Sequence, residues 1–176
     1  VYLRLYSLGI PHNRPRIFIV GVLSYYDTGF SFPKPIRCCN IRGFLDRCRH
    51  SVRSKHLPTS AGSRNNVLDA LAAIRRSGGD PFTDTYFVDC DSVPARAHIK
   101  HGASLCLTHS RAHGHWITSR GRYMTVKEMM RLQGFPESYK MPASDRQCGQ
   151  LLGNSMCVDV LVHILARLLD CTQLLA

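Results

Sequence analysis

The sequence is poor in acidic residues, poor in lysine and without a long apolar run. Its 176 residues contain 12 Asp and Glu against 23 Lys and Arg, a formal net charge of +11, and 18 of the 23 bases are Arg. The longest apolar stretch, residues 17–23, has seven residues, whereas about 20 are needed to span a bilayer, so we expect no membrane partner. A domain this basic typically binds polyanions, and Arg favours bidentate contacts with phosphate or guanine. A basic component of an acidic complex is the alternative.

Regular cysteine spacing is also missing. The eight cysteines include no Cys-x-x-Cys pair and no signal peptide is evident, so we expect reduced thiols and no metal in an intracellular protein. Two zinc alternatives can be drawn, neither with a known ligand spacing: Cys39, Cys48, His50 and His56, or His109, His113 and His115. The sequence opens with Val1 instead of Met, as expected of a processed product or a fragment.

By composition the chain divides into residues 1–31, 32–121 and 122–176. In the first part, residues 16–22 predict a buried strand, apolar on both faces, of the kind found in sheets covered by helices. The second part is rich in Ser, Arg, His and Gly and carries 14 bases and six acids between Lys34 and Arg120, which is typical of loops that contact nucleic acid. Arginines that are merely solvated are the alternative.

One helix is predicted in the second part. The Asn pair at residues 65–66 is its expected N-cap and the Gly pair at 78–79 its end. Strands are expected near residues 86–88 and 105–108. The expected buried face of the helix comprises Val67, Leu68, Leu71, Ala72 and Ile74.

The third part is more regular. Thr125 and Glu128 form a capping box ahead of a helix that ends at residues 134–136, Gly-Phe-Pro. A long apolar helix follows, with a broad buried face at three- and four-residue steps: Val158, Leu161, Val162, Leu165, Ala166 and Leu169.

Three segments together resemble conserved motifs of the DNA cytosine-C5 methyltransferases. Residues 9–21, Gly-Ile-Pro-His-Asn-Arg-Pro-Arg-Ile-Phe-Ile-Val-Gly, are similar to the eighth motif, Gln-x-Arg-x-Arg followed by a strand. Residues 122–136, which end in Arg-Leu-Gln-Gly-Phe-Pro, resemble the ninth motif, and residues 150–158, Gln-Leu-Leu-Gly-Asn-Ser-Met-Cys-Val, resemble the tenth. The segments stand in the family's order, with the long gap where the family keeps its variable target-recognition region.

The resemblance implies roles for particular side chains. Arg14 and Arg16 would line the pocket that receives the flipped cytosine, with Arg16 at the base oxygen O2, and their strand spacing would put both on one face. His12 stands where the family has Gln. The alternative to a pocket role is that Arg14 and Arg16 are a pair of surface arginines. Arg131 and Gln133 are expected to hydrogen-bond or pack in the helix that joins the recognition region to the catalytic domain.

The tenth motif implies a cofactor contact. Asn154, Ser155 and Val158, expected at the start of the apolar helix, would bind the methionine moiety of S-adenosylmethionine, because free amides at a helix start suit a carboxylate. An ordinary helix cap is the alternative. In the basic middle region, the residues expected to bind nucleic acid are Arg111, His115 and Trp116.

Several of the family's catalytic elements are missing from the chain. No Pro-Cys-Gln, Glu-Asn-Val or Phe-x-Gly-x-Gly occurs. The resemblance therefore implies an α/β fold, the C-terminal part of a Rossmann-like S-adenosylmethionine-dependent methyltransferase with a small irregular target-recognition domain. It would share the cofactor and DNA with an N-terminal catalytic half, in the nucleus or an organelle of a eukaryote or the cytoplasm of a bacterium. The alternative is a catalytically dead remnant, acting as a basic structural or nucleic-acid-binding subunit of a larger assembly.

Overall fold

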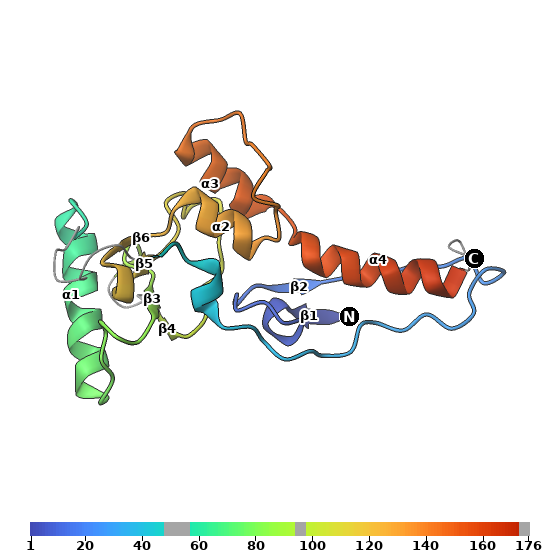
Figure 1. The fold of residues 1–176 in the computed structure, drawn as a ribbon, viewed down its shortest axis with the longest axis horizontal. Coiled ribbons are helices and arrows are strands. Elements are labelled where there is room, and N and C mark those ends of the chain that lie inside the picture. The colour runs from blue at the N-terminus through green and yellow to red at the C-terminus, as the bar shows by residue number, and fades with distance from the viewer. Residues whose placement is uncertain (48–56, 94–97, 173–176) are drawn as a thin grey trace.

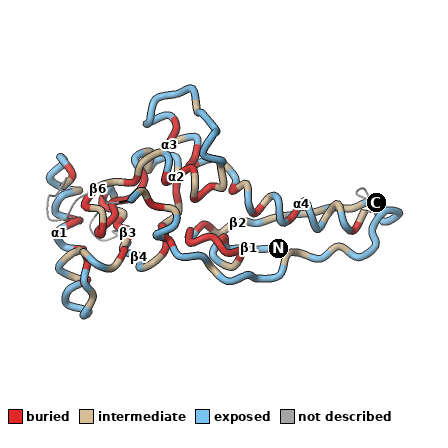
Figure 2. The backbone as a smooth tube through the Cα atoms, viewed as in Figure 1, coloured by how far each residue is buried: buried red, intermediate tan, exposed pale blue. Residues whose placement is uncertain are grey.

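The structure is a computed structural model, and it describes residues 1–47, 57–93 and 98–172. These residues form an elongated molecule with two small antiparallel sheets (Figure 1). α1 (Ala61–Arg76) lies at one end of the molecule and α4 (Val158–Thr172) at the other. Buried residues concentrate around the central sheet and the N-terminal hairpin, whereas α4 and the loop that follows the hairpin are largely exposed (Figure 2).

The N-terminal segment folds as a short hairpin. β1 (Tyr2–Arg4) pairs antiparallel with β2 (Pro15–Ile17), and η1 (Leu5–Ser7), a single 3-10 turn, follows β1 directly. One core cluster joins this segment to the beginning of α4. Its buried members are Leu5, Leu8, Ile10, Cys157, Val160 and Ile164.

The expected buried strand at residues 16–22 is wrong for this structure. β2 ends at Ile17, and the side chains of Ile17 and Ile19 are 73% and 91% exposed. The buried face expected on α4 is also wrong. None of its six predicted residues is buried, Val162 and Leu165 are 57% and 50% exposed, and the buried residues of α4 are instead Val160, Ile164 and Cys171. In both cases the apolar residues are present, but the described chain supplies no second layer to cover them.

The central sheet is antiparallel and has four short strands in the order β4 (Ile99–His101), β3 (Tyr86–Val88), β5 (Trp116–Ile117), β6 (Arg122–Tyr123). The strand expected at residues 86–88 is confirmed, and the one expected at 105–108 is wrong. That segment instead runs alongside the N-terminal segment, through the bridge between His12 and Ser104. Two 3-10 turns, η2 (Ile41–Phe44) and η4 (Thr118–Arg120), complete this region.

α1 packs on the central sheet through a narrower face than the sequence predicts. It begins at Ala61, so Asn66 lies inside the helix and not at its cap. The buried Asn66 side chain donates hydrogen bonds of 2.8 Å to the carbonyls of Cys90 and Ser92. Leu68, expected to be buried, is 47% exposed. The apolar residues of this second core cluster are Val67, Ala70, Val88, Cys90 and Trp116.

Two consecutive helices begin with capping boxes. α2 (Val126–Leu132) begins after Thr125, whose hydroxyl accepts from the Glu128 amide while the Glu128 carboxylate accepts from the Thr125 amide, as predicted. α3 (Asp145–Asn154) begins after Ser144 in the same way. The third and largest core cluster draws on both helices, the central sheet and η2. α2 ends before Gly134, whose φ of 72° lies in the left-handed region that glycine adopts without strain.

One helical stretch, Asp145–Thr172, is long and apolar enough to cross a membrane by length and composition, which the short apolar runs did not predict. α4, the apolar part of this stretch, has 15 residues and is about 22 Å long at 1.5 Å per residue, less than the ~30 Å hydrocarbon core. Its buried residues Val160 and Ile164 pack on the N-terminal hairpin. α4 thus packs on protein through a few residues only, and most of the helix is exposed.

Candidate functional site

The predicted base-pocket segment lies against the loop that precedes β5. The amide of Asn13 donates to the carbonyl of Ser104, and the amide of Ser104 donates to the carbonyl of Pro11, both at 2.8 Å. The fully buried ring of His12 accepts a hydrogen bond at Nε2 from the amide of Leu107, at 3.2 Å. His12 therefore ties two backbone segments together from the position where the resemblance places Gln.

Arg14 is held inside the protein by backbone carbonyls. The residue is 1% exposed, and its guanidinium donates to the carbonyls of Leu107, Gly153 and Ser155, the last two at 2.9 and 2.6 Å. Burial lowers the pKa of Arg14, and repulsion from Arg16 adds to this. A buried guanidinium that satisfies three carbonyls from two distant segments fixes their relative position.

Arg16 has a different setting although it is only two residues away. It lies in β2 opposite Leu3, and its guanidinium makes one hydrogen bond, to the carbonyl of the neighbouring Pro15 at 2.7 Å. The side chain is half-buried. Of the two predicted pocket arginines, Arg14 is committed to the fold and Arg16 retains donors for another group.

The predicted cofactor residues lie at the junction of α3 and α4. Val158 begins α4, as expected, whereas the helix start expected at Asn154 and Ser155 is wrong. Asn154 is the last residue of α3, Ser155 follows it as the C-cap, and α4 begins only at Val158. The amide of Val158 donates to the carbonyl of Gln133 at 2.9 Å, and the hydroxyl of Ser155 donates to Leu152 at 2.9 Å. The start of α4 therefore lies three residues beyond Ser155, and the amide of its first residue is already bonded.

These residues fit a cofactor only as an edge of its site. Among the described residues, the Asn154 side chain is exposed and has no hydrogen-bond partner, so its amide is open to a ligand. The polar groups of Ser155 and the amide of Val158 are already bonded within the protein. S-adenosylmethionine would therefore need further groups from elsewhere.

The three residues expected to contact nucleic acid are largely occupied in the fold. Arg111 forms a bidentate ion pair with Asp89 at 2.7 and 3.2 Å and also donates to Ser92. His115 and Trp116 are each 2% exposed, at the start of β5. Because both rings are almost fully buried, neither can contact a duplex unless neighbouring residues move.

The resemblance predicts hydrogen-bonding or packing roles for Arg131 and Gln133. Gln133 is fully buried, donates from Nε2 to the carbonyl of Leu152 at 2.7 Å and accepts the Val158 amide at its own carbonyl. It thus joins α2 to the α3–α4 junction, as expected. Arg131 is partly exposed and pairs with Asp46 and Glu137.

Two glycines of α3 contribute to the site and were not predicted. A Cβ at Gly149 would overlap the backbone of Ala112, and a Cβ at Gly153 would overlap the backbone of Thr108 and His109. Only glycine allows α3 to approach the 108–112 loop this closely. The sequence did carry a signal for this contact, because two glycines four residues apart lie on the same face of a helix.

The described cysteines are free thiols. The first zinc alternative includes Cys48, His50 and His56, which lie outside the described residues. In residues 1–47, 57–93 and 98–172, no three His, Cys, Asp or Glu side chains are grouped to hold a metal ion, His109, His113 and His115 included.

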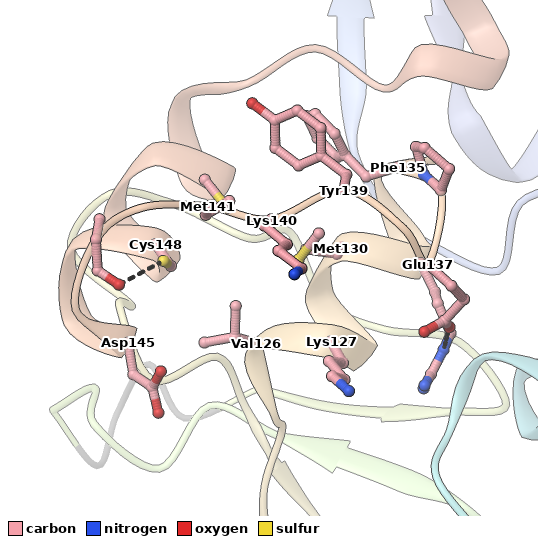
Figure 3. Close-up of a pocket in the computed structure, with 13 residues that line it drawn as sticks. Val126, Lys127, Met130, Phe135, Glu137, Tyr139, Lys140, Met141, Asp145 and Cys148 are labelled. Atoms are coloured by element: carbon pink, nitrogen blue, oxygen red, sulfur yellow. Dashed lines mark hydrogen bonds and ion pairs between the residues drawn. The ribbon is translucent and has the colours of Figure 1, made fainter.

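A hollow of about 390 Å³ lies between α2, α3 and the 135–144 loop (Figure 3). Phe135 and Tyr139, with ring centroids 5.2 Å apart, form one wall, and Lys127 and Lys140 line it as well. At its edge, Cys148 donates to the carbonyl of Ala143. Arg131 lines this hollow, whereas none of the residues predicted to bind the base, the cofactor or nucleic acid does so.

Several bacterial enzymes are similar to the chain over most of its length. It is 29% identical over 170 residues to the type II methyltransferase M.NlaX of Neisseria lactamica, covering 90% of this chain and 48% of that protein. It is 32% identical over 171 residues to M.HpaII of Haemophilus parainfluenzae, covering 86% and 45%. A shorter match, 43% over 51 residues, is to a tRNA (cytosine(38)-C(5))-methyltransferase of Spodoptera frugiperda, 28% of this chain and 15% of that protein. The chain spans about half the length of the bacterial relatives.

Solved structures show the same fold. The Dnmt2 methyltransferase of S. pombe superposes with a TM-score of 0.52 at 19% identity, covering 97% of this chain and 56% of that one. The methyltransferase EhMeth of Entamoeba histolytica gives 0.51 at 19% identity, covering 97% and 52%. The model of the C-5 cytosine-specific DNA methylase family matches residues 3–170, nearly the whole chain, and the protein therefore belongs to that family.

Proposed function

We propose that this chain supplies the target-recognition part, the base-pocket arginine and one edge of the cofactor site of a DNA cytosine-C5 methyltransferase. In this proposal, methyl transfer to C5 of a flipped cytosine requires a catalytic half that carries the cysteine nucleophile. The observation that carries the proposal is the family match over residues 3–170 in a chain about half as long as its relatives.

The family's nucleophile motif is missing from the sequence, and two of the described thiols have the wrong properties for a nucleophile. No Pro-Cys-Gln occurs in the sequence. Burial raises the pKa of the Cys90 thiol to about 11 and also raises the pKa of Cys157. A nucleophilic cysteine needs the opposite shift, because the thiolate is the reactive form. The proposal therefore places the nucleophile in the catalytic half.

Exposed apolar residues indicate where the catalytic half would pack on this chain. Ile17, Ile19 and Leu23 are between 68% and 91% exposed, and Val162 and Leu165 of α4 are at least half exposed. These residues belong to the N-terminal segment and to α4, which lie at the same end of the molecule (Figures 1 and 2). Large apolar side chains exposed together at one end of a molecule are typical of interaction surfaces.

Arg16 is the residue proposed to act on the base. Addition of a thiolate at C6 of cytosine places negative charge on the pyrimidine, and a guanidinium at the base oxygen stabilises that charge in the transition state. Arg14 holds the segment that carries Arg16 in place through its three carbonyls. S-adenosylmethionine, when bound, supplies the methyl group, and the Asn154 amide would contact it.

The test is reconstitution with a catalytic half. The 176-residue chain is combined with a complementing N-terminal half that carries the cysteine, and transfer of radiolabelled methyl from S-adenosylmethionine is measured on duplex DNA and, separately, on tRNA. Methylation of DNA cytosine by the complex, with neither half active alone, is the expected result. Transfer to tRNA alone would replace the DNA substrate by RNA. Methyl transfer by the isolated chain would contradict the proposal that the nucleophile lies in the catalytic half.

The alternative, a remnant without methyl-transfer activity, makes a distinct prediction in the same experiment. Such a protein would bind nucleic acid with a steep dependence on salt, because neutralising phosphates releases counterions, yet the complex would transfer no methyl group to either substrate.

A further inference from the structure

The hollow between α2, α3 and the 135–144 loop has no part in the function proposed above. Its floor is continuous with the largest core cluster, because Val126, Phe135 and Met141 are half-buried and pack against the cluster that contains Met130. The loop on its other side is exposed from residue 136 to residue 140. The hollow is therefore open to solvent above a floor that is fixed by the core, and its volume of about 390 Å³ is that of a small-ligand site.

The apolar lining of the hollow suits an aromatic ring. The ring centroids of Phe135 and Tyr139 lie 5.2 Å apart and their planes are 40° apart, so the two rings form one aromatic wall. The thioethers of Met130 and Met141 line the same hollow. A methionine sulfur makes favourable contacts with aromatic rings, and the unbranched side chain adapts to the shape of a ligand. Tyr139 is 48% exposed, so part of this apolar wall is left for a ligand to cover.

The charged lining suits a ligand with a single negative charge. Three cationic and two acidic side chains line the hollow, which leaves one net positive charge. Arg131 and Glu137 neutralise each other in an ion pair, and Asp145 lies in the first turn of α3, where the helix dipole stabilises a carboxylate. Lys127 and Lys140, in contrast, form no ion pair within the described part of the chain.

We propose that this hollow binds a small aromatic carboxylate, with its ring against the aromatic wall and its carboxylate at Lys127 and Lys140. Figure 3 shows Lys140 extending from the 135–144 loop toward Met130 of α2, which brings a cationic group to the apolar floor. A phosphate ester would add a second negative charge next to the two acidic side chains of the lining. The inference goes beyond the proposed function, because none of the residues predicted to bind the base, the cofactor or nucleic acid lines the hollow.

The first test uses methionine methyl groups as reporters. Of the five methionines in the sequence, Met130 and Met141 line the hollow and the other three do not. The 176-residue chain, isotopically labelled at the methionine methyl groups, is titrated with phenylacetate and followed by NMR. A ligand of this size should bind with a Kd of about 1–10 mM. The signals of Met130 and Met141 should shift, whereas that of Met156, which is 48% exposed but lies outside the hollow, should not.

Two matched probes separate the ring from the charge. Phenylacetamide has the same ring without the charge and should bind about tenfold more weakly, because one charge-assisted contact is lost. Acetate has the charge without the ring and should leave the methionine signals unchanged at the same concentrations. Equal affinities for phenylacetate and phenylacetamide would overturn the carboxylate proposal. Shifts at Met156 equal to those at Met130 would show adsorption to any exposed apolar group and would overturn the site.

Substitutions at exposed positions locate the charged contact. Replacing both Lys127 and Lys140, as Lys127→Gln with Lys140→Gln, should weaken phenylacetate binding about tenfold. Lys100→Gln is the matched control, because Lys100 is an exposed residue of β4 that does not line the hollow. Equal affinities of the double variant and the control would remove both lysines from the site. These measurements use the chain alone, so their failure is distinguishable from a failure of methyl transfer by the reconstituted complex.

Discussion

The guanidinium of Arg14 donates a hydrogen bond of 2.9 Å to the carbonyl of Gly153, which lies 139 residues further along the chain. The same side chain reaches Leu107 and Ser155. One residue thus joins the N-terminal segment, the loop before β5 and the end of α3. The resemblance places Arg14 in the base pocket, but in this structure its two terminal guanidinium nitrogens donate to carbonyls of the protein itself.

We expect Arg14→Ala to destabilise the chain by about 3 kcal/mol or more, because three carbonyls lose a buried charged donor. Arg14→Lys should recover little of this, since an ammonium cannot reproduce the planar fork of a guanidinium. The free energy of unfolding is measured by urea denaturation monitored by circular dichroism.

Arg16→Ala is the matched control for this measurement. Its guanidinium bonds only to the adjacent Pro15 carbonyl, so its loss should change stability by less than about 0.5 kcal/mol. Equal destabilisation by both substitutions would show that Arg14 does not hold the three segments together.

Stability should fall as the pH drops below about 6.5, because two buried imidazoles resist protonation. Burial lowers the pKa of His12 to about 3 and that of His115 to about 4, whereas a histidine in the unfolded chain titrates near 6.5. Below pH 6.5 the unfolded state therefore binds more protons than the folded state. Each histidine then costs about 1.4 kcal/mol per pH unit until its folded-state pKa is reached.

Urea denaturation at pH 7.5, 6.5, 5.5 and 4.5 measures this loss. His12→Gln, which restores the residue type of the family motif, should remove about half of the pH dependence, while His163→Gln, at an exposed position of α4, should leave it unchanged. Above about pH 5 carboxylates contribute little to this loss, since Asp and Glu in an unfolded chain titrate near 3.9 and 4.3. A stability that is flat from pH 7.5 to 4.5 would contradict the burial of both rings as neutral groups.

Glu128 should be more important to stability than its place on a short helix suggests. It is fully buried and accepts two hydrogen bonds from Arg122, at 2.8 and 2.9 Å, and one each from the amides of Thr125 and Asp46. Glu128→Gln should cost about 2–3 kcal/mol in the free energy of unfolding, because one buried partner of an ion pair becomes uncharged.

Glu137→Gln provides the comparison for Glu128→Gln. Glu137 also pairs with an arginine, Arg131, but its side chain is 62% exposed, and exposed pairs contribute about 0–1 kcal/mol. Similar losses at both positions, measured by thermal and urea denaturation, would contradict the difference in burial.

Local sequence rules predicted the elements whose signals are local. The capping box at Thr125 and Glu128 and the strand at residues 86–88 depend on contacts within a few residues. The hydrophobic core, in contrast, depends on contacts between residues that are distant in the sequence. One cluster combines Phe87 and Ile117 of the sheet with Leu152 of α3, so packing crosses the boundary that composition placed at residues 121 and 122.

The sequence could not predict which apolar residues would be covered. Ile17 and Ile19 have the pattern of a buried strand, yet they are exposed because burial depends on a neighbouring layer rather than on the strand itself. The candidate site also depends on contacts that the local sequence does not predict. The spacing of Arg14 and Arg16 predicted one shared face, but the partners that separate them, Leu107 and Gly153, are distant in sequence.

In a complex reconstituted with a catalytic half, Arg16→Ala should lower the rate of methyl transfer about a hundredfold, while DNA affinity changes little. One guanidinium adds little to a surface with many bases, but a donor directed at developing charge acts mainly in the transition state, where its loss costs about 3 kcal/mol. Single-turnover rates at saturating DNA and cofactor measure the effect. Equal rates for the variant and the unaltered complex would remove Arg16 from the base pocket.

The close approach of α3 to the 108–112 loop should fail when either of its two glycines gains a side chain. A Cβ at Gly149 or Gly153 overlaps backbone atoms of residues 108–112, which cannot move away as a flexible side chain can. Gly149→Ala and Gly153→Ala should each cost about 2 kcal/mol or more, despite the higher helix propensity of Ala. Gly62→Ala in α1 is the matched control, because its Cβ meets nothing closer than 4.0 Å, and there Ala should stabilise the helix by about 0.5–1 kcal/mol. Urea denaturation of the three variants measures these changes. Stabilisation at all three positions would show that α3 does not pack on the loop through its glycines.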